Sequence, residues 1–175
     1  MSSLPKLLYK YRDLYEGVPD DSSSVLTLKG KWFETICLYF FKHDPGYKSQ
    51  FENVWLWNDW PGRDNKPDTG IDIVAKIKDR DKFCAIQCKF YEPEYSISKP
   101  DIDTFLAASS KEIYSQRIII STSANWNKNA EDTIQNQNPP CIRLGIKNLE
   151  QSSIDWSRFN IEDLEAVSYA PPKTL

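Results

Sequence analysis

Apolar and polar residues recur along this chain with two different periods, and the period changes several times. A spacing of three to four residues predicts helices, whereas alternation or a short apolar run predicts strands. Helical spacing extends over residues 4–15, 27–42, 101–114 and 127–137. Strand-like segments occupy residues 51–57, 69–78, 82–91, 117–122 and 141–145. This order of elements predicts an α/β fold, in which helices pack on the faces of a sheet.

Proline and glycine mark the breaks between these segments. Pro45-Gly46 is expected to stop the second helix, and residues 60–68 (WPGRDNKPD) are expected to form a loop. Near the C-terminus the sequence AVSYAPPKTL has no apolar period. We therefore expect a domain over residues 1–165 and a linker over residues 166–175.

Length and composition narrow the class of protein. The 175 residues, 40% hydrophobic and 27% charged, are typical of one globular domain. The longest apolar run, residues 36–41, is far shorter than the ~20 residues of a membrane span. The N-terminus does not resemble a signal peptide, and the four cysteines form no CxxC pair. We expect a soluble cytoplasmic protein with reduced thiols and no membrane partner.

The charge is not that of a typical nucleic-acid-binding protein. The net charge is −3, whereas a chain that binds nucleic acid unaided usually has a basic excess. The distribution is uneven, because residues 76–89 contain five basic side chains and two acidic ones, and residues 150–165 contain five acidic and one basic. Either an acidic face meets a protein neighbour, or both segments are solvated surface, which is the simpler interpretation.

The strands at 69–78 and 82–91 are separated by a polar tip and are expected to form a hairpin. A turn at residues 79–82 would place Asp72 opposite Lys89, with Gln87 on the adjacent diagonal of the same face. Two interpretations fit these polar residues among apolar neighbours. One is a cross-strand salt bridge at a solvated edge, worth about 0–1 kcal/mol. The other is a hard-cation site, in which Asp72, the Gln87 side-chain oxygen and the Cys88 backbone carbonyl bind Mg²⁺ beside Lys89.

Four short motifs occur here in the order found in one nuclease family. Gly70-Ile71-Asp72 followed by Gln87-Cys88-Lys89 resembles the GxD…QxK form of the PD-(D/E)xK nuclease core in its Mrr-like branch. GKWFE at residues 30–34 resembles the GxxFE helix of that branch, whose Glu points to the metal site. IISTSANWNKNAED at residues 119–132 resembles the Ser/Thr-ended strand and the helix that complete the core.

This resemblance implies a restriction-endonuclease-like fold, with a mixed central sheet flanked by helices, and a DNA-hydrolysing activity. It implies that Asp72 is the central Mg²⁺ ligand, that Mn²⁺ can substitute, and that Gln87 is a second ligand. It further implies that Lys89 orients the attacking water or stabilises charge on the phosphate, and that Glu34 completes or tunes the site.

A longer resemblance covers residues 29–159, which are similar to the N-terminal nuclease region of the single-chain type ISP restriction-modification enzymes. It implies double-stranded DNA as substrate and a covalently linked ATP-dependent helicase-like motor, methyltransferase and target-recognition domain. A tethered motor would supply DNA affinity as effective concentration and would account for the acidic net charge. One site cuts one strand, so the resemblance also implies transient pairing of two nuclease domains.

Several alternatives stay open at this stage. Asp68 is a rival to Asp72 as the metal ligand. It lies in the loop before the strand and lacks the apolar run that buries a ligand, so we expect it at most to support the ligands from behind. Trp55 and Trp57 are expected in the core, while Trp60 and Arg63 are candidates for DNA contact. The alternative functions are a catalytically silent DNA-binding or docking module, a methylation-dependent restriction nuclease and a junction-resolving nuclease.

Overall fold

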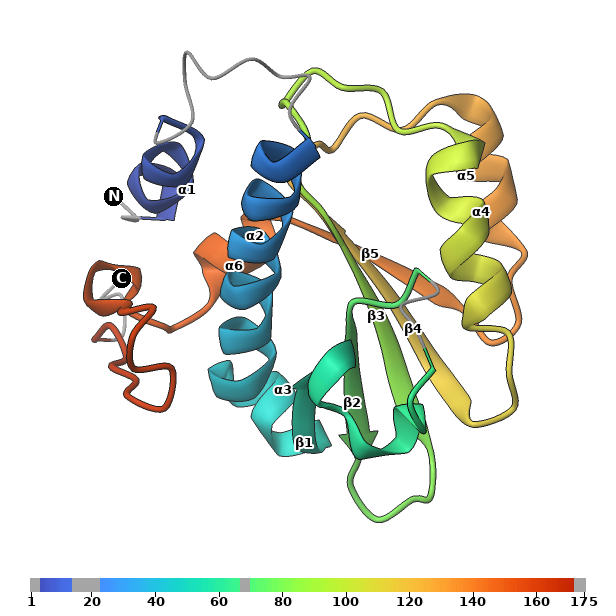
Figure 1. The fold of residues 1–175 in the computed structure, drawn as a ribbon, viewed down its shortest axis with the longest axis horizontal. Helices are drawn as coiled ribbons and strands as arrows, with labels where there is room; N and C mark the ends of the chain where they lie inside the picture. The colour runs from blue at the N-terminus through green and yellow to red at the C-terminus, as the bar shows by residue number, and fades with distance from the viewer. Residues whose placement is uncertain (1–3, 14–22, 67–69, 172–175) are drawn as a thin grey trace.

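A five-stranded sheet forms the centre of the structure, which is a computed structural model that describes residues 4–13, 23–66 and 70–171 (Figure 1). The strand order is β1-β2-β3-β4-β5; β1, β2 and β3 are antiparallel, and β3, β4 and β5 run parallel. The strands are β1 (Phe51–Leu56), β2 (Ile73–Ile77), β3 (Phe83–Lys89), β4 (Tyr114–Ser121) and β5 (Cys141–Gly145). The predicted mixed α/β fold is confirmed.

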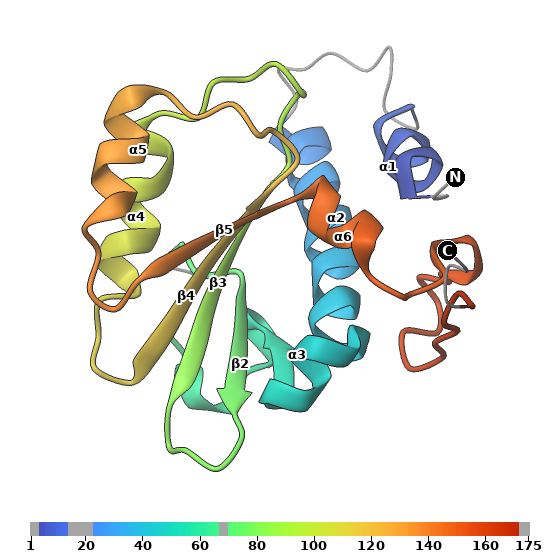
Figure 2. The ribbon, with the colours of Figure 1, turned by 180° about the vertical axis from the view of Figure 1, so that it is seen from behind.

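Helices cover both faces of this sheet (Figures 1 and 2). On one side lie α1 (Leu4–Asp13), α2 (Ser23–His43) and α6 (Ile146–Gln151), and on the other α4 (Lys99–Ala108) and α5 (Lys128–Gln135). The short α3 (Pro45–Gln50) connects α2 to β1, and single 3-10 turns are η1 (Trp57–Asp59), η2 (Pro61–Arg63) and η3 (Trp156–Arg158).

The helix ends explain where prediction and structure differ. Pro45 ends α2 as expected, but it also begins α3, because Asp44 accepts hydrogen bonds from the N–H groups of Gly46 and Tyr47. The helix predicted to reach residue 114 ends at Ala108, where the hydroxyls of Ser109 and Ser110 hydrogen-bond carbonyls of the last turn. The helix α6 was not predicted.

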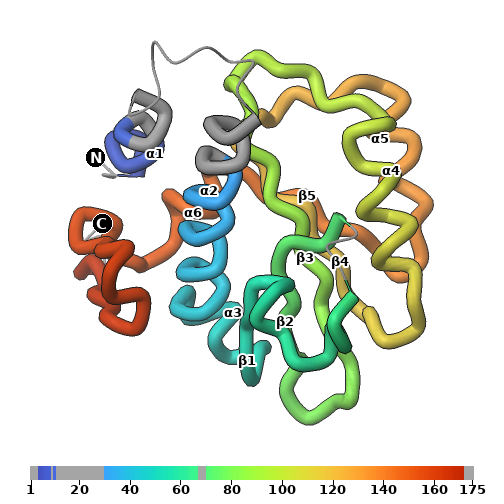
Figure 3. The backbone as a smooth tube through the Cα atoms, in the orientation of Figure 1, coloured from blue at the N-terminus to red at the C-terminus, as the bar shows by residue number. Residues whose placement is uncertain are grey.

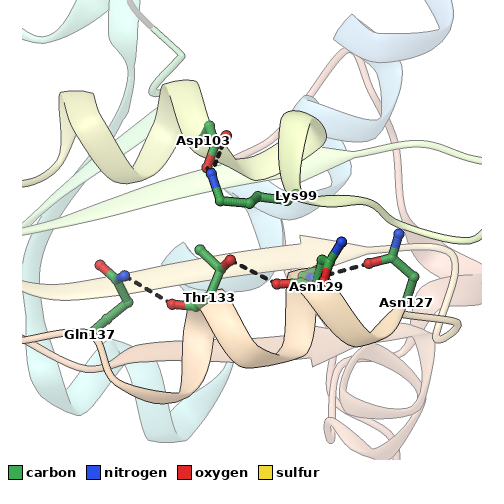
Figure 4. A network of polar contacts seen from close by, with 7 residues as sticks. Lys99, Asp103, Asn127, Asn129, Thr133 and Gln137 are labelled. Carbon is green, nitrogen blue, oxygen red and sulfur yellow. Dashed lines mark hydrogen bonds and ion pairs between the residues drawn. The ribbon is translucent and has the colours of Figure 1, made fainter.

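Two apolar layers hold the sheet between its helices. The layer on the α2 side contains Ile73, Ala75 and Ile86, and the layer on the α4 side contains Val74 and Ala85. Successive residues of a strand point to opposite faces, so β2 and β3 supply both layers. Figure 4 shows the side-chain hydrogen bonds along α5. Asn127 caps its N-terminus by accepting the Ala130 N–H at 2.9 Å, and the Thr133 hydroxyl and the Gln137 amide donate to carbonyls four residues earlier. Lys99 and Asp103 pair along α4 in the same view.

The β2–β3 hairpin has a different register from the predicted one. Val74 lies opposite Ala85, and the Ile77 N–H donates to the Lys82 carbonyl at 3.0 Å. The loop is therefore residues 78–81, one residue earlier than predicted, with Asp79 at φ 60°. The pairing shifts by two residues, so the prediction that Asp72 faces Lys89 is wrong. An even shift leaves the side chains of β2 and β3 on their predicted faces, whereas Ile71, expected on the face of Ile73, packs on the opposite face.

Residues 164–171 lie beside α2 (Figure 3). The Leu164 carbonyl is 2.7 Å from His43 Nε2, and the Tyr39 hydroxyl donates to the Ala166 carbonyl at 2.9 Å. The Tyr169 hydroxyl donates to the His43 carbonyl. The boundary at residue 165 stays a prediction. Among the described helices, none has the length and apolar character needed to cross a bilayer.

Candidate active site

Asp72 reaches its position through an irregularity at the start of β2. Its N–H donates to the Ile86 carbonyl at 3.0 Å, although Ile86 already faces Ile73. Two residues therefore oppose one, the arrangement of a β-bulge, which commonly redirects side chains near active sites. Ile71 accordingly packs in the layer on the α4 side, while Ile73 packs on the α2 side.

Gly70 makes this entry into the strand possible. Its φ is +99°, a conformation that favours glycine, and a Cβ there would lie 3.0 Å from the Thr104 side chain and 3.4 Å from the backbone of α4. The glycine of the GxD motif thus has a physical reason: it lets the chain turn tightly against α4 immediately before Asp72.

The Asp72 carboxylate is aimed at the backbone of β3. Its Oδ2 accepts the Cys88 N–H at 2.7 Å, and the Asp72 carbonyl accepts the Trp57 N–H at 2.9 Å. Asp72 also opens into a cleft of about 300 Å³, which it shares with Lys31, Glu34 and Thr35 of α2 and with residues of η1. The structure therefore brings Asp72 and Glu34, which are distant in sequence, to one cleft.

The pKa of the Cys88 thiol is affected by both carboxylates. Burial raises its pKa well above the usual value, and contact with Cys37 and the negative charges of Asp72 and Glu34 raise it further. A neutral thiol leaves the Cys88 carbonyl, between Gln87 and Lys89, as the oxygen that this residue can offer a cation.

Gln87 carries an unsatisfied oxygen. The side chain is 5% exposed, and its Nε2 donates to the Gly70 carbonyl at 3.3 Å. Among the residues that the structure describes, none offers a hydrogen bond to Gln87 Oε1. A buried acceptor without a hydrogen bond costs about 1–3 kcal/mol, so the oxygen retained there suits a bound ion or an ordered water molecule.

The donor set fits a hard cation. The three predicted ligands, the Asp72 carboxylate, the Gln87 amide oxygen and the Cys88 carbonyl, are all oxygens, as Mg²⁺ prefers, although Gln87 and Cys88 do not line the cleft that holds Asp72. Within residues 4–13, 23–66 and 70–171, no group of three or more His, Cys, Asp or Glu side chains could hold a metal. A zinc-type site is therefore not formed by the described residues.

Lys89 is the last residue of β3, and its side chain lies on the α4 side of the sheet. Its Nζ is 6.0 Å from the centre of the Tyr91 ring, and its charge acts on Asp101 of α4. Burial opposes the ionised form of Asp101. Hydrogen bonds from Ser98 and Tyr95 and the charge of Lys89 outweigh burial and hold the pKa of this carboxyl below its usual value.

The backbone around Lys89 is fixed by the end of β4. The Thr122 N–H donates to the Lys89 carbonyl at 3.0 Å, and the Thr122 hydroxyl accepts from the Tyr91 N–H and donates to the Tyr91 carbonyl. Neither Thr122 nor Asp101 was identified from the sequence. The pattern Ser98-x-x-Asp101, a capping box, was the available signal for Asp101.

Other candidates lie elsewhere. Trp60 is 5% exposed, so the prediction that it contacts DNA is wrong. It packs with Trp57 and Phe83 in the layer on the α4 side, and Trp57 and Trp55 join that layer as predicted. Asp68 lies outside the described residues.

Comparison with known proteins identifies this architecture. Residues 42–166 match the family model of a restriction endonuclease, of the Mrr catalytic type. Asp72, Gln87 and Lys89 fall within that range, and Glu34 precedes it. A comparison with curated proteins gave no significant match.

Two solved structures are similar to this chain. The ATP-dependent type ISP restriction-modification enzyme LlaBIII, bound to DNA, is 35% identical with a TM-score of 0.72, over 86% of this chain and 10% of that enzyme. The MspJI restriction endonuclease, in complex with a 27-mer oligonucleotide, is 14% identical with a TM-score of 0.46, over 85% of this chain and 30% of that one. The chain thus spans about a tenth of the length of the first enzyme.

Proposed function

Since this chain belongs to the restriction endonuclease family and is a DNA endonuclease, we propose that it hydrolyses phosphodiester bonds of double-stranded DNA with Mg²⁺ at Asp72 and Gln87. The observation that carries the proposal is the buried, unsatisfied Gln87 oxygen, held by Gly70 next to Asp72. Asp72, Gln87 and the Cys88 carbonyl would hold the ion, and Mn²⁺, which takes the same oxygen ligands, would substitute.

A bound divalent ion would polarise the phosphate and lower the pKa of a water molecule. The chain itself supplies the geometry and the remaining charge. Asp72 Oδ2 is fixed by the Cys88 N–H, so the carboxylate needs little further ordering to bind an ion. Glu34 provides a second carboxylate in the same cleft, and it would act on the ion directly or through water.

Lys89 would act on the phosphate. When water attacks phosphorus in line, a P–O bond to water forms, the bond to the leaving sugar oxygen breaks, and negative charge builds on the phosphate oxygens. The Lys89 ammonium stabilises that charge or orients the water. Its backbone is held by Thr122, and Tyr91 and Asp101 border its side chain on the α4 side.

We further propose that this domain, residues 1–165, is the nuclease part of a larger ATP-dependent restriction-modification enzyme that acts in the cytoplasm. The support is the likeness to LlaBIII, of which this chain covers only 10%. Residues 166–175 would lead to the helicase-like motor, followed by methyltransferase and target-recognition domains. Such a motor would deliver DNA to a domain whose net charge of −3 gives it weak affinity. Two nuclease domains would pair transiently to cut both strands.

The test is nicking of supercoiled plasmid by the purified chain with Mg²⁺ or Mn²⁺. We expect nicking by the wild type, none with EDTA, and none with Asp72→Ala. The matched control is Asp81→Ala, an exposed carboxylate in the 78–81 loop at the other end of the hairpin. Nicking that survives Asp72→Ala would contradict the proposed site. A silent wild type that stays silent with the motor restored would contradict the function.

A further inference from the structure

A second cleft lies where β4 and β5 end. Its volume is about 490 Å³, and it is bordered by the Ser121–Thr122–Ser123 segment on one side and by Arg143 and Lys147 on the other. Neither cation has a role in the reaction described above. In open α/β sheets, ligands characteristically bind outside the carboxyl ends of parallel strands, and this cleft occupies that position.

The cleft continues the edge of the sheet that carries the catalytic residues. Lys89 is paired with Ser121, and Ser121 is paired with Gly145, so these three residues lie at one level on adjacent parallel strands. Neighbouring strands are about 4.8 Å apart, so the backbone at Gly145 is about 10 Å from that at Lys89. The two points are thus close enough for one DNA strand to pass both of them.

The Arg143 side chain is already ordered for binding. Its guanidinium lies over the indole of Trp126, with Cζ 5.0 Å from the ring centre. One of its terminal nitrogens, Nη1, is 3.4 Å from the Glu131 carboxylate. A guanidinium held on an aromatic face and at one nitrogen loses little entropy when its other N–H groups bind an anion.

The charges of the cleft select the class of ligand. Arg143 and Lys147 contribute two positive charges, and Glu131 contributes one negative charge. A single carboxylate that is already paired does not form a cation site, whereas two cations at one cleft suit a phosphate group. The Arg143 side chain is 43% exposed, so a phosphate can approach it from solvent.

We propose that this cleft binds a backbone phosphate of the DNA, on the same edge of the sheet as the phosphate that is cleaved. This inference rests on the proposed nuclease function and adds a phosphate subsite, Arg143 with Lys147, on the same edge of the sheet. Trp126 and Glu131 are positioning residues that hold the guanidinium. The subsite sets the direction of the bound strand across Lys89.

The test is the salt dependence of DNA binding by the full chain, with EDTA present to prevent cleavage. Fluorescence anisotropy of a labelled duplex is measured over a series of sodium chloride concentrations. Each phosphate contact contributes about 0.9 to the slope of log K against log salt, so Arg143→Gln is expected to reduce the slope by about 0.9. Lys147→Gln, a second exposed position, is expected to reduce it similarly.

The matched control is Arg158→Gln. Arg158 also pairs with one carboxylate, that of Asp155, and is 73% exposed, but it lies on η3 beside α2. We expect its slope to equal that of the wild type. An unchanged slope for both Arg143→Gln and Lys147→Gln, or a wild type without measurable DNA binding, would overturn the subsite. Metal-dependent nicking abolished by Asp72→Ala would still support the nuclease, so the two proposals can fail separately.

Discussion

The replacement Gln87→Met tests whether the buried amide is kept for a ligand. Methionine has nearly the shape of glutamine, but it has neither the Nε2 donor nor the Oε1 acceptor. In the metal-free protein we expect this variant to be at least as stable as the wild type. In the presence of Mg²⁺ we expect the order of the two stabilities to reverse.

The magnitudes follow from the contacts of this side chain. Losing the Nε2 bond to the Gly70 carbonyl, at 3.3 Å, should cost about 1 kcal/mol. Removing the unsatisfied Oε1 should raise the free energy of unfolding by about 1–3 kcal/mol. The net gain of about 1 kcal/mol corresponds to a melting temperature higher by about 2–4 °C for a chain of this length.

Metal binding acts in the opposite sense. A ligand at one hundred times its Kd stabilises the folded state by about 2.7 kcal/mol. The wild-type melting temperature should therefore rise by about 5–10 °C on saturation with Mg²⁺, while that of Gln87→Met should hardly change. Thermal unfolding followed by circular dichroism, in EDTA and across a magnesium titration, gives both quantities.

The control is Gln87→Glu, which keeps the oxygen and adds a charge. It should be less stable than the wild type in EDTA, because a carboxylate is buried, and should show a larger shift with Mg²⁺. The reasoning is refuted if Gln87→Met is clearly destabilised in EDTA and magnesium raises its melting temperature as much as it raises that of the wild type.

Three further predictions concern other parts of the domain. Glu34→Gln should lower metal-dependent plasmid nicking by roughly 10–100-fold without unfolding the protein, whereas the exposed Glu52→Gln should not; equal rates for both would exclude Glu34 from the site. Because the pKa of Asp101 is lowered in the folded state, its stabilising effect is present above its unfolded pKa, about 3.9, and is lost as pH falls through the lower folded value. Urea unfolding should thus separate Asp101→Asn from the wild type at pH 7 and bring them together in acid, and a constant difference would contradict this. Arg117 is 2% exposed and donates to the Pro139 carbonyl and the Gln137 side chain. Arg117→Met should therefore lower the free energy of unfolding, measured in urea, by at least about 3 kcal/mol. A loss below about 1 kcal/mol would contradict this prediction.

The sequence pattern determined the type and order of most elements. All five strands and four helices lie near their predicted positions, because the periods of two and of three to four residues are local properties of the chain. The same pattern isolated Asp72, Gln87 and Lys89, since polar residues stand out in otherwise apolar strands. Helix ends were less predictable, and the serine hydroxyls that end α4 are one reason.

Tertiary structure decided how these residues meet. The hairpin register depends on which residue takes the left-handed conformation, and Asp79 does so here. The bulge at Asp72 depends on the close packing of Gly70 against α4, which lies about thirty residues further along the chain.

Burial and long-range neighbours also required the fold. Trp60 belongs to a turn-rich segment yet is buried, because it packs against Phe83 and Tyr114 of the central strands. The stacking of Arg143 on Trp126 joins β5 to the segment after β4. Such pairs leave no periodic trace in the sequence, because their distance is set by strand order and not by spacing along the chain. The sequence thus predicted the candidate residues, and packing decided how they are placed.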